Sequence, residues 1–241
     1  MYNNVKIFDS PIELARSLSL EIQSAVNNKA DKFSLSISGG STPTILFNQL
    51  AQPPYKNEIN WNKLNFFWCD ERCVSPTDSQ SNYGEVKKKL FDFISIPEMN
   101  IHRVRGESDP NEETVRYASE VESCLPFTEN KLPQFDWVLL GVGGDGHTAS
   151  LFPGKNFLFI YSNIAGVAQH PATGQKRISL TKEVLNNSKR ISFIVTGKSK
   201  AKVISELLNG LPISKNYPAS EIKPTDGIID WMIDKEAAFY L

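Results

Sequence analysis

The chain has 241 residues, which is enough for one sizeable α/β domain with a buried core. Its 26 Lys and Arg residues nearly balance its 27 Asp and Glu residues, so the overall charge favours neither nucleic acid nor an anionic membrane as a partner. Three cysteines, Cys69, Cys73 and Cys124, form no paired disulfide framework and no usual zinc-ligand pattern. The N-terminus lacks the pattern of a secretion signal and no apolar stretch is long enough to span a membrane, so we expect a cytoplasmic protein.

Short apolar runs alternate with amphipathic stretches along the whole chain. The stretch from Ser10 begins with the capping-box sequence Ser-Pro-Ile-Glu, and its apolar residues then recur at helical spacing. Similar patterns predict helices over about 10–28, 43–50, 83–93, 109–125 and 199–209. The apolar runs predict strands at 5–8, 33–38, 64–69, 135–140, 177–180 and 191–195. This alternation predicts a single α/β domain over residues 1–241, with a mainly parallel central sheet and helices on both faces.

Ligands of an open α/β sheet bind beyond the carboxyl ends of its strands, so the loops after the apolar runs are candidate sites. The first such loop contains Gly39, Gly40, Ser41 and Thr42, and Pro43 then begins a helix. The glycines free backbone amides, the hydroxyls add donors, and the positive end of the helix faces the loop. The loop lacks the lysine and the spacing of a Walker loop. It therefore predicts a phosphate-binding turn, with a plain capped helix start as the alternative.

The most informative loop follows the apolar run Phe-Asp-Trp-Val-Leu-Leu. Asp145 and His147 lie there in a glycine-rich turn. A carboxylate two residues from an imidazole can fix the tautomer of the ring and stabilise its charged form, which suits proton transfer near neutral pH. The backbone amides of Gly143, Gly144 and Gly146 are candidates for stabilising an oxyanion. The alternative is a surface histidine in an ordinary glycine turn.

Charged residues stand at the ends of further strands. Asp70 and Arg72 come directly after the strand at 64–69, and Arg177 begins a strand of its own. Lys198 and Lys200 lie between a strand and a helix, where a lysine can add a point charge beside an anion held by amides. Each of these residues, taken alone, is equally explained by a solvated surface.

Two other kinds of residue need a separate interpretation. Ser150 follows the histidine turn but lacks the Gly-x-Ser-x-Gly pattern of a nucleophile elbow, so we expect no covalent catalysis. His102 and His170 have no comparable sequence context and are expected to be structural or at the surface. The segment 152–176, which contains Pro, Asn and Gly residues, is predicted to be the most irregular part of the chain.

Five blocks of sequence occur in a specific order across nearly the whole chain. They are Ser-Gly-Gly-Ser-Thr-Pro from Ser38, Trp-Cys-Asp-Glu-Arg-Cys-Val from Trp68 with Ser-Asn-Tyr-Gly from Ser81, Leu-Gly-Val-Gly-Gly-Asp-Gly-His-Thr-Ala-Ser-Leu-Phe-Pro-Gly from Leu140, Arg-Ile-Ser-Leu-Thr from Arg177, and Val-Thr-Gly-Lys-Ser-Lys-Ala from Val195. Together these blocks closely resemble the 6-phosphogluconolactonase family. The resemblance implies a Rossmann-like fold, shared with glucosamine-6-phosphate deaminases, and a hydrolase that needs no metal and no cofactor. The implied substrate is a small sugar-phosphate lactone, 6-phospho-D-glucono-1,5-lactone, and we expect a monomer or a homodimer.

The resemblance also implies roles for individual residues. His147 would act as general base with Asp145 beside it, and Asp70 and Arg72 would line the same site. The residues implied to hold the 6-phosphate are Gly39, Gly40, Ser41, Thr42, Arg177 and Lys200, with Lys198 as the alternative to Lys200.

Two alternative functions remain open from the sequence. In the related deaminases, the histidine turn resembles Asp-Gly-His-Ile-Ala-Phe-Asn-Glu, with an acid five residues after the histidine, whereas this chain has Phe152 there. A phenylalanine cannot transfer a proton, which favours hydrolysis over deamination. A sugar-phosphate sensor without turnover is the other alternative, although such a protein would be expected to lose the proton-transfer pair first. The loop 168–174 also departs from the Ala-Pro-Lys-like stretch that is common in the lactonases, which leaves the outer phosphate contacts open.

Overall fold

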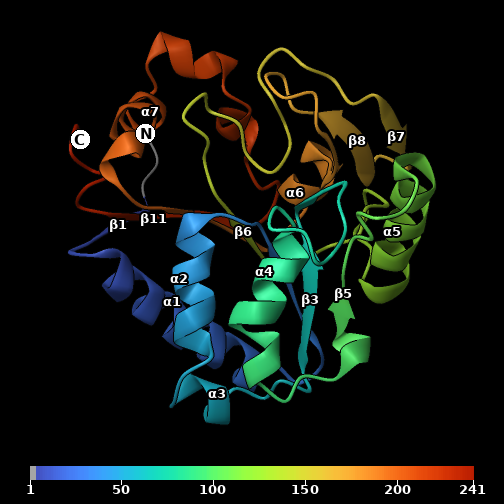
Figure 1. Ribbon diagram of the computed structural model, residues 1–241. Coiled ribbons are helices and arrows are strands. Elements are labelled where there is room, and N and C mark those ends of the chain that lie inside the picture. The colour runs from blue at the N-terminus through green and yellow to red at the C-terminus, as the bar shows by residue number, and fades with distance from the viewer. Residues whose placement is uncertain (1–3) are drawn as a thin grey trace.

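The computed structural model describes residues 4–241, in which two sheets share one hydrophobic core (Figure 1). The larger sheet has the strand order β1-β11-β10-β6-β2-β3-β5, and all its pairings are parallel. Its strands are β1 (Val5–Phe8), β2 (Phe33–Ile37), β3 (Leu64–Trp68), β5 (Ile101–His102), β6 (Trp137–Leu140), β10 (Arg190–Val195) and β11 (Ile228–Asp234). The smaller sheet is antiparallel, with the order β4-β9-β8-β7, and consists of β4 (Asp70–Arg72), β7 (Phe159–Tyr161), β8 (Ala165–Gln169) and β9 (Lys176–Leu180).

The helices follow from the local sequence. The side chain of Ser10 caps the first helix and that of Asp109 caps the fifth, each with a proline in the first turn. The helices are α1 (Pro11–Asn28), α2 (Ser41–Leu50), α3 (Tyr55–Glu58), α4 (Asn82–Lys89), α5 (Pro110–Cys124), α6 (Lys182–Asn186) and α7 (Ala201–Leu208). Short 3₁₀ turns lie at η1 (Phe91–Phe93), η2 (Glu98–Asn100), η3 (Lys198–Lys200), η4 (Pro212–Asn216) and η5 (Pro218–Glu221).

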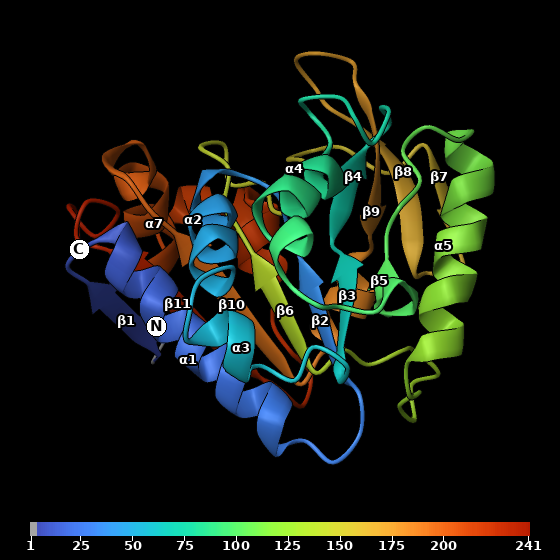
Figure 2. The same ribbon diagram turned by 60° about the horizontal axis from the view of Figure 1, so that its bottom comes forward.

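The strand order places helices on both faces of the large sheet. The chain passes from β1 to β2, β3 and β5 in one direction along the sheet, and from β5 to β6, β10 and β11 in the other. Because such crossovers are right-handed, α1, α2 and α4 cover one face and α7 lies on the opposite side, while α5 packs on the smaller sheet against β7, β8 and β9. Figure 2 shows α1, α2 and α4 in front of the strands. This arrangement confirms the predicted sheet with helices on both faces.

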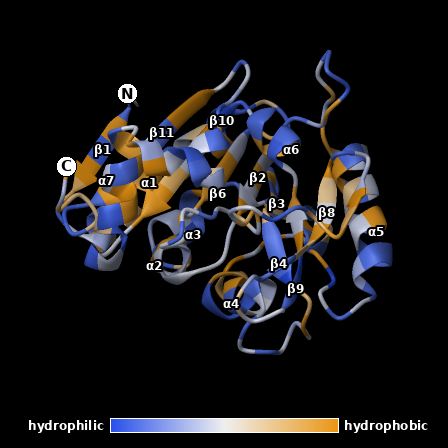
Figure 3. Ribbon diagram, turned by 90° about the horizontal axis from the view of Figure 1, so that it is seen from above, coloured by the Kyte–Doolittle hydropathy of each residue, from blue (hydrophilic) through white to orange (hydrophobic). Residues whose placement is uncertain are grey.

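The change of direction occurs between β2 and β6, which are hydrogen-bonded neighbours. The next strand of the large sheet after β2 is β3 and the next after β6 is β10, on opposite sides of this pair, which is the arrangement that opens a crevice for ligands in open α/β sheets. Both β2 and β6 are buried along their whole length. The strand β11, farther along the same sheet, is also largely hydrophobic (Figure 3). The interior strands therefore form a rigid base below the loops.

Three predictions from the sequence are corrected by the structure. Residues 70–72 do not simply end the strand before them, because the chain turns at Cys69 and pairs as β4 with β9 in the second sheet. The segment 152–176 is less irregular than expected, since it contains β7 and β8, which pair with each other as a hairpin, and β8 also pairs with β9. The strand β11 was not anticipated, because Asp230 and Asp234 interrupt its apolar run.

No helix within residues 4–241 has both the length and the apolar character to cross a membrane.

The open edge at the end of β3 gives a test of the fold. Trp68 lies beyond the last residue that pairs with β5, and the Tyr117 hydroxyl accepts from its N–H at 2.9 Å and donates to its carbonyl at 2.7 Å. We expect Tyr117→Phe to lower the free energy of unfolding by about 1–3 kcal/mol, because the buried N–H and carbonyl of Trp68 both lose their hydrogen-bond partner. Urea denaturation measures this change. The same substitution at the exposed Tyr240 is the control, and an equal effect there would contradict the assignment.

Candidate active site

A pocket of about 220 Å³ opens beyond the carboxyl ends of β2, β6 and β10. Its walls bring together most of the residues that the sequence singled out from separate loops. They are Gly39, Gly40, Ser41, Thr42, Asp70, Arg72, Gly143, His147, Arg177 and Lys200. A larger hollow of about 430 Å³ lies beside Phe152 and contains neither His147 nor the residues 39–42. The smaller pocket is therefore the one that combines a titratable pair with anion-binding groups.

His147 and Asp145 form a hydrogen-bonded pair. The Nδ1 atom of His147 lies 2.6 Å from Oδ1 of Asp145, which also accepts from the main-chain N–H of His147 at 3.2 Å. An ionised carboxylate can only accept, so Nδ1 carries the proton and Nε2 is left as the basic nitrogen. Burial raises the pKa of Asp145, but the charge of His147 and these hydrogen bonds outweigh it and hold that pKa below its ordinary value. Asp145 itself does not line the pocket and acts on the imidazole from behind.

The turn 141–147, which we call the acid–base turn, is held by its own backbone. The N–H of Gly143 donates to the carbonyl of His147 at 2.8 Å, and the N–H of Gly146 donates to the carbonyl of Gly143 at 3.0 Å. Gly144 is exposed and lies outside the pocket wall. Two of these three amides are therefore used to close the turn, and their assignment to an oxyanion stays a prediction that no contact here supports.

Two arginines lie directly opposite each other across β4 and β9. Arg72 pairs in register with Arg177, and like charges in such a position repel. The carboxylate of Asp70 lies close to this pair, with Oδ2 3.8 Å from Nη1 of Arg177. Burial lowers the pKa of Arg177, while Asp70 opposes this shift. Two guanidinium groups at the wall of one pocket favour an anionic ligand there.

Both arginines keep hydrogen-bonding capacity for a ligand. Within residues 4–241, the Nε atoms of Arg72 and Arg177 are buried and have no hydrogen-bond partner. Arg72 is anchored only through Nη1, which donates to the carbonyl of Gln80 at 2.5 Å. A buried donor without a partner is costly, and a bound anion would satisfy it.

Asp70 is fixed from the opposite side by Ser150. The hydroxyl of Ser150 donates to Oδ2 of Asp70 at 2.7 Å, and both side chains are buried. The hydroxyl is thus engaged as a structural donor, which agrees with the expectation that Ser150 is not a nucleophile.

The residues Gly39, Gly40, Ser41 and Thr42, which we call the anion cradle, lie at the N-terminus of α2. Gly40 is the N-cap and has a φ of 124°, a conformation that L side chains rarely adopt. The hydroxyl of Thr42 forms a hydrogen bond of 2.7 Å with that of Thr196 at the end of β10. The positive end of the helix therefore faces the pocket and is tied to a neighbouring strand.

The two candidate lysines are separated by the structure. Lys200 lines the pocket, and burial lowers its pKa although the charge of Asp145 opposes this shift. The Nζ atom of Lys198 lies 4.2 Å from the centre of the Phe239 ring, and Lys198 is not part of the pocket wall. Lys200 is thus the lysine available to an anion in this site.

The other histidines have structural partners. His102 stacks on Phe67 at 4.4 Å and contacts Glu120 at 2.9 Å. Nδ1 of His170 accepts from two backbone amides of its own hairpin, and its ring packs on Phe152. Phe152 also lies 5.1 Å from the His147 ring, so an apolar ring occupies the position where the deaminases place an acid.

Among the pocket-wall residues to which the sequence analysis gave no role is Asn82. Asn82, at the start of α4, is buried and donates from Nδ2 to the main-chain carbonyl of Asp70 at 2.9 Å. It lies within the Ser-Asn-Tyr-Gly block that contributed to the resemblance, but no local pattern gave it a role. As for metals, no group of three His, Cys, Asp or Glu side chains in the described part of the chain is placed to hold an ion.

Comparisons with known proteins agree with this geometry. The family model described as glucosamine-6-phosphate isomerases/6-phosphogluconolactonase matches residues 9–231. The chain is 46% identical to the 6-phosphogluconolactonase of Aggregatibacter actinomycetemcomitans over 90% of both chains, and 48% identical to that of Haemophilus influenzae over 84% of this chain and 85% of the relative. The crystal structure of the devB protein superposes with a TM-score of 0.93, at 44% identity and over 99% of each chain.

The acid–base turn gives a test that requires no substrate. A Cβ at Gly143 would lie 2.1 Å from Nδ1 of His147 and 2.6 Å from Oδ1 of Asp145, so Gly143→Ala must separate the pair. We expect the pKa of Asp145 to rise toward its ordinary value in this variant, which a carboxyl NMR titration measures. The matched control is Gly144→Ala, where a Cβ meets no atom within 4 Å and the pKa should stay low.

The lowered pKa of Asp145 also determines how the stability of the fold depends on pH. Because the folded-state pKa of Asp145 lies below its ordinary value, the pair stabilises the fold at pH above that value, and this contribution is lost as the pH falls through the lowered pKa. The Gly143→Ala variant should lack this part of the acid dependence. An unchanged pKa for Asp145 in Gly143→Ala would contradict the assigned contact.

Proposed function

The chain belongs to the family of glucosamine-6-phosphate isomerases and 6-phosphogluconolactonases, and on this premise we propose that it hydrolyses 6-phospho-D-glucono-1,5-lactone to 6-phosphogluconate. That reaction is the second step of the oxidative pentose phosphate pathway. The observation that carries the proposal is the presence, in one pocket, of the imidazole of His147 and the anion cradle at the end of α2. A lactone that carries a phosphate on its far end needs both.

The phosphate binds at the cradle. The N-terminus of α2 supplies backbone amides and the positive end of a helix, and Lys200 and Arg177 add charge from the two neighbouring walls. Binding energy from this end of the substrate is remote from the reacting carbon and orients the lactone toward His147. No metal or cofactor takes part in the proposed reaction.

Proton transfer is the task of His147. Nε2 takes a proton from the water that attacks C1 of the lactone, and the oxygen of that water forms the new bond to C1. Asp145 stabilises the imidazolium through Nδ1. When the bond between C1 and the ring oxygen breaks, Nε2 returns the proton to that oxygen, and the product ionises to the carboxylate. One imidazole thus acts first as base and then as acid.

The oxyanion on C1 is stabilised by Arg72. Its Nε is buried and without a partner among residues 4–241, while Nη1 is anchored on Gln80. A preorganised donor of this kind contributes roughly 3–4 kcal/mol to transition-state stabilisation. Asp70 pairs with Arg177 and is itself held by Ser150, so its role is to keep Arg177 in place.

Hydrolysis is favoured over deamination by the contacts of Phe152. Deamination of an amino sugar requires a further proton-transfer group after the histidine turn, and this position is filled by a buried phenyl ring that packs on His147 and lies 5.7 Å from the Arg177 guanidinium. The intact pair of His147 and Asp145 favours an enzyme over a sugar-phosphate sensor.

For the compartment and the assembly, we propose a cytoplasmic protein that acts as a monomer or a homodimer. We place the protein in the cytoplasm, because its three cysteines are free and a sugar-phosphate substrate is produced there. All side chains assigned to the reaction come from one chain, so a monomer is sufficient, and a homodimer would carry two independent sites.

The central test compares His147→Asn with the unsubstituted protein on freshly prepared 6-phosphogluconolactone. We expect kcat to fall by about 10²–10⁴-fold, because the general base is removed. Acid release against the spontaneous rate measures turnover, and calorimetry should show nearly unchanged affinity for 6-phosphogluconate. Retention of most turnover would show that His147 is not the base. Ammonia release from glucosamine 6-phosphate would instead support the deaminase.

The phosphate end is tested with the two lysines. Lys200→Ala should raise KM by about tenfold or more while kcat changes little, since it removes a charge from remote binding and not from the reacting centre. Lys198→Ala is the matched control, because that side chain lies on Phe239 outside the pocket. Equal KM values for the two variants would remove Lys200 from the phosphate site.

A further inference from the structure

Asn82 lines the pocket but takes no part in the chemistry described above. Its side chain is almost fully buried, with 2% exposure. Its main-chain N–H donates to Oε1 of Glu71 at 2.8 Å, and its side-chain Nδ2 donates to the main-chain carbonyl of Asp70 at 2.9 Å. The residue is therefore fixed both at its backbone and at the tip of its side chain.

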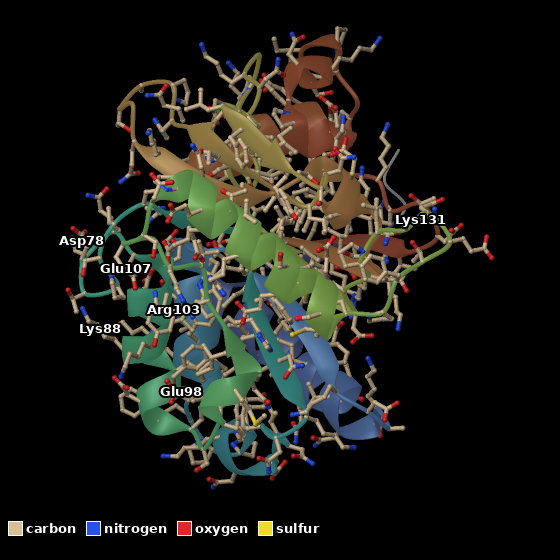
Figure 4. All side chains as sticks on the ribbon, turned by 90° about the vertical axis from the view of Figure 1, so that its right-hand side faces the viewer. Asp78, Lys88, Glu98, Arg103, Glu107 and Lys131 are labelled. Atoms are coloured by element: carbon tan, nitrogen blue, oxygen red, sulfur yellow. The ribbon has the colours of Figure 1, made fainter. Side chains whose placement is uncertain are left out.

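The carboxylate of Glu71 holds the turn in which Asn82 lies. It accepts from the N–H of Tyr83 at 2.7 Å and from that of Arg72, also at 2.7 Å. Burial raises the pKa of Glu71, and these hydrogen bonds oppose the rise. On the outer side, the guanidinium of Arg103 lies 5.1 Å from the Tyr83 ring and pairs with Glu107 (Figure 4). Glu71 thus holds the turn on its buried side, and Arg103 packs against it on the outer side.

The remaining polar atom of Asn82 faces the anion cradle. A Cβ at Gly39 would lie 1.9 Å from Oδ1 of Asn82 and 2.4 Å from its Cγ. Gly39 does not have a positive φ, so its backbone conformation is open to any residue. The contact with Asn82 is what requires a glycine there. Gly40 differs, because its φ of 124° requires glycine and a Cβ would come no nearer than 4.0 Å to Pro43.

We propose that Asn82 is a positioning residue that sets the separation between the two ends of the pocket. Its Oδ1 lies against Gly39 of the anion cradle, and its Nδ2 donates to the main-chain carbonyl of Asp70 at the reacting end. The side-chain amide of Asn82 therefore fixes the position of each end relative to the other. A second hydrogen bond also joins the helix that carries Asn82 to the helix that follows Gly39, since the Thr44 hydroxyl on α2 donates to Glu85 on α4. This role rests on the proposed function, in which both ends act on one substrate.

The contact between Gly39 and Asn82 is tested by suppression. Gly39→Ala should lower kcat/KM for the phosphorylated lactone by about 100-fold, because the cradle is displaced from the reacting end. Asn82→Ala removes the atoms that the new methyl would meet. The double variant should therefore match Asn82→Ala alone, with no further loss. If Gly39→Ala lowers kcat/KM equally in both backgrounds, the proposal is overturned.

Gly40→Ala is the matched control for this experiment. Its defect arises from backbone conformation, so it should lower kcat/KM by the same factor with or without Asn82→Ala. Should Gly39→Ala alone fail to give folded protein, recovery of a cooperative thermal transition in the double variant supports the contact. Failure of the double variant to fold, when Asn82→Ala itself folds, counts against it.

A second readout separates positioning from a general loss of structure. Asn82→Ala should reduce kcat/KM for 6-phosphogluconolactone by about tenfold more than for the unphosphorylated glucono-1,5-lactone, which makes no use of the cradle. An equal fall for both lactones would show a structural role only. If the unsubstituted protein hydrolyses neither lactone, the proposed function fails, and the suppression is then measured on the Kd for 6-phosphogluconate by calorimetry.

Discussion

The hydrogen-bonded pairing of β2 with β6 is the constraint on which the site depends. The two strands are clamped by Ser34 and Asp136, since Oδ2 of Asp136 accepts from the Ser34 N–H at 2.9 Å and the Ser34 hydroxyl accepts from the Asp136 N–H at 2.9 Å. Burial raises the pKa of Asp136, but Lys29, Ser34 and Lys189 together lower it. The anion cradle follows one strand and the acid–base turn follows the other, so this single pairing brings residues about a hundred positions apart to one crevice.

The second sheet supplies the charge that the first sheet lacks. The protein as a whole is nearly neutral, yet the pairing of β4 with β9 places Arg72 opposite Arg177 at the pocket wall. Like charges in this position repel each other, which favours an anionic substrate in the pocket. Anion selectivity in this molecule is therefore a local property of two short strands and not of its net charge.

The glycines around the pocket are required for different physical reasons. Gly40 needs its positive φ, Gly143 leaves room for the contact between His147 and Asp145, and Gly39 leaves room for Asn82. Gly144 meets no neighbour and serves none of these purposes. The sequence interpretation gave all of them the same task, freeing amides for a ligand, and the hydrogen bonds within the acid–base turn show that this view was too simple.

The sequence alone determined the alternation of strands and helices, the parallel sheet, and the loops that carry His147 and the cradle, because periodicity, caps and glycine turns are local signals. Only the tertiary structure decided that Asp70 and Arg72 belong to a second sheet, that Lys200 and not Lys198 lines the pocket, and that Asn82 is part of its wall. These features depend on pairings between distant segments and on packing of single side chains. Neither leaves a periodic trace in the chain.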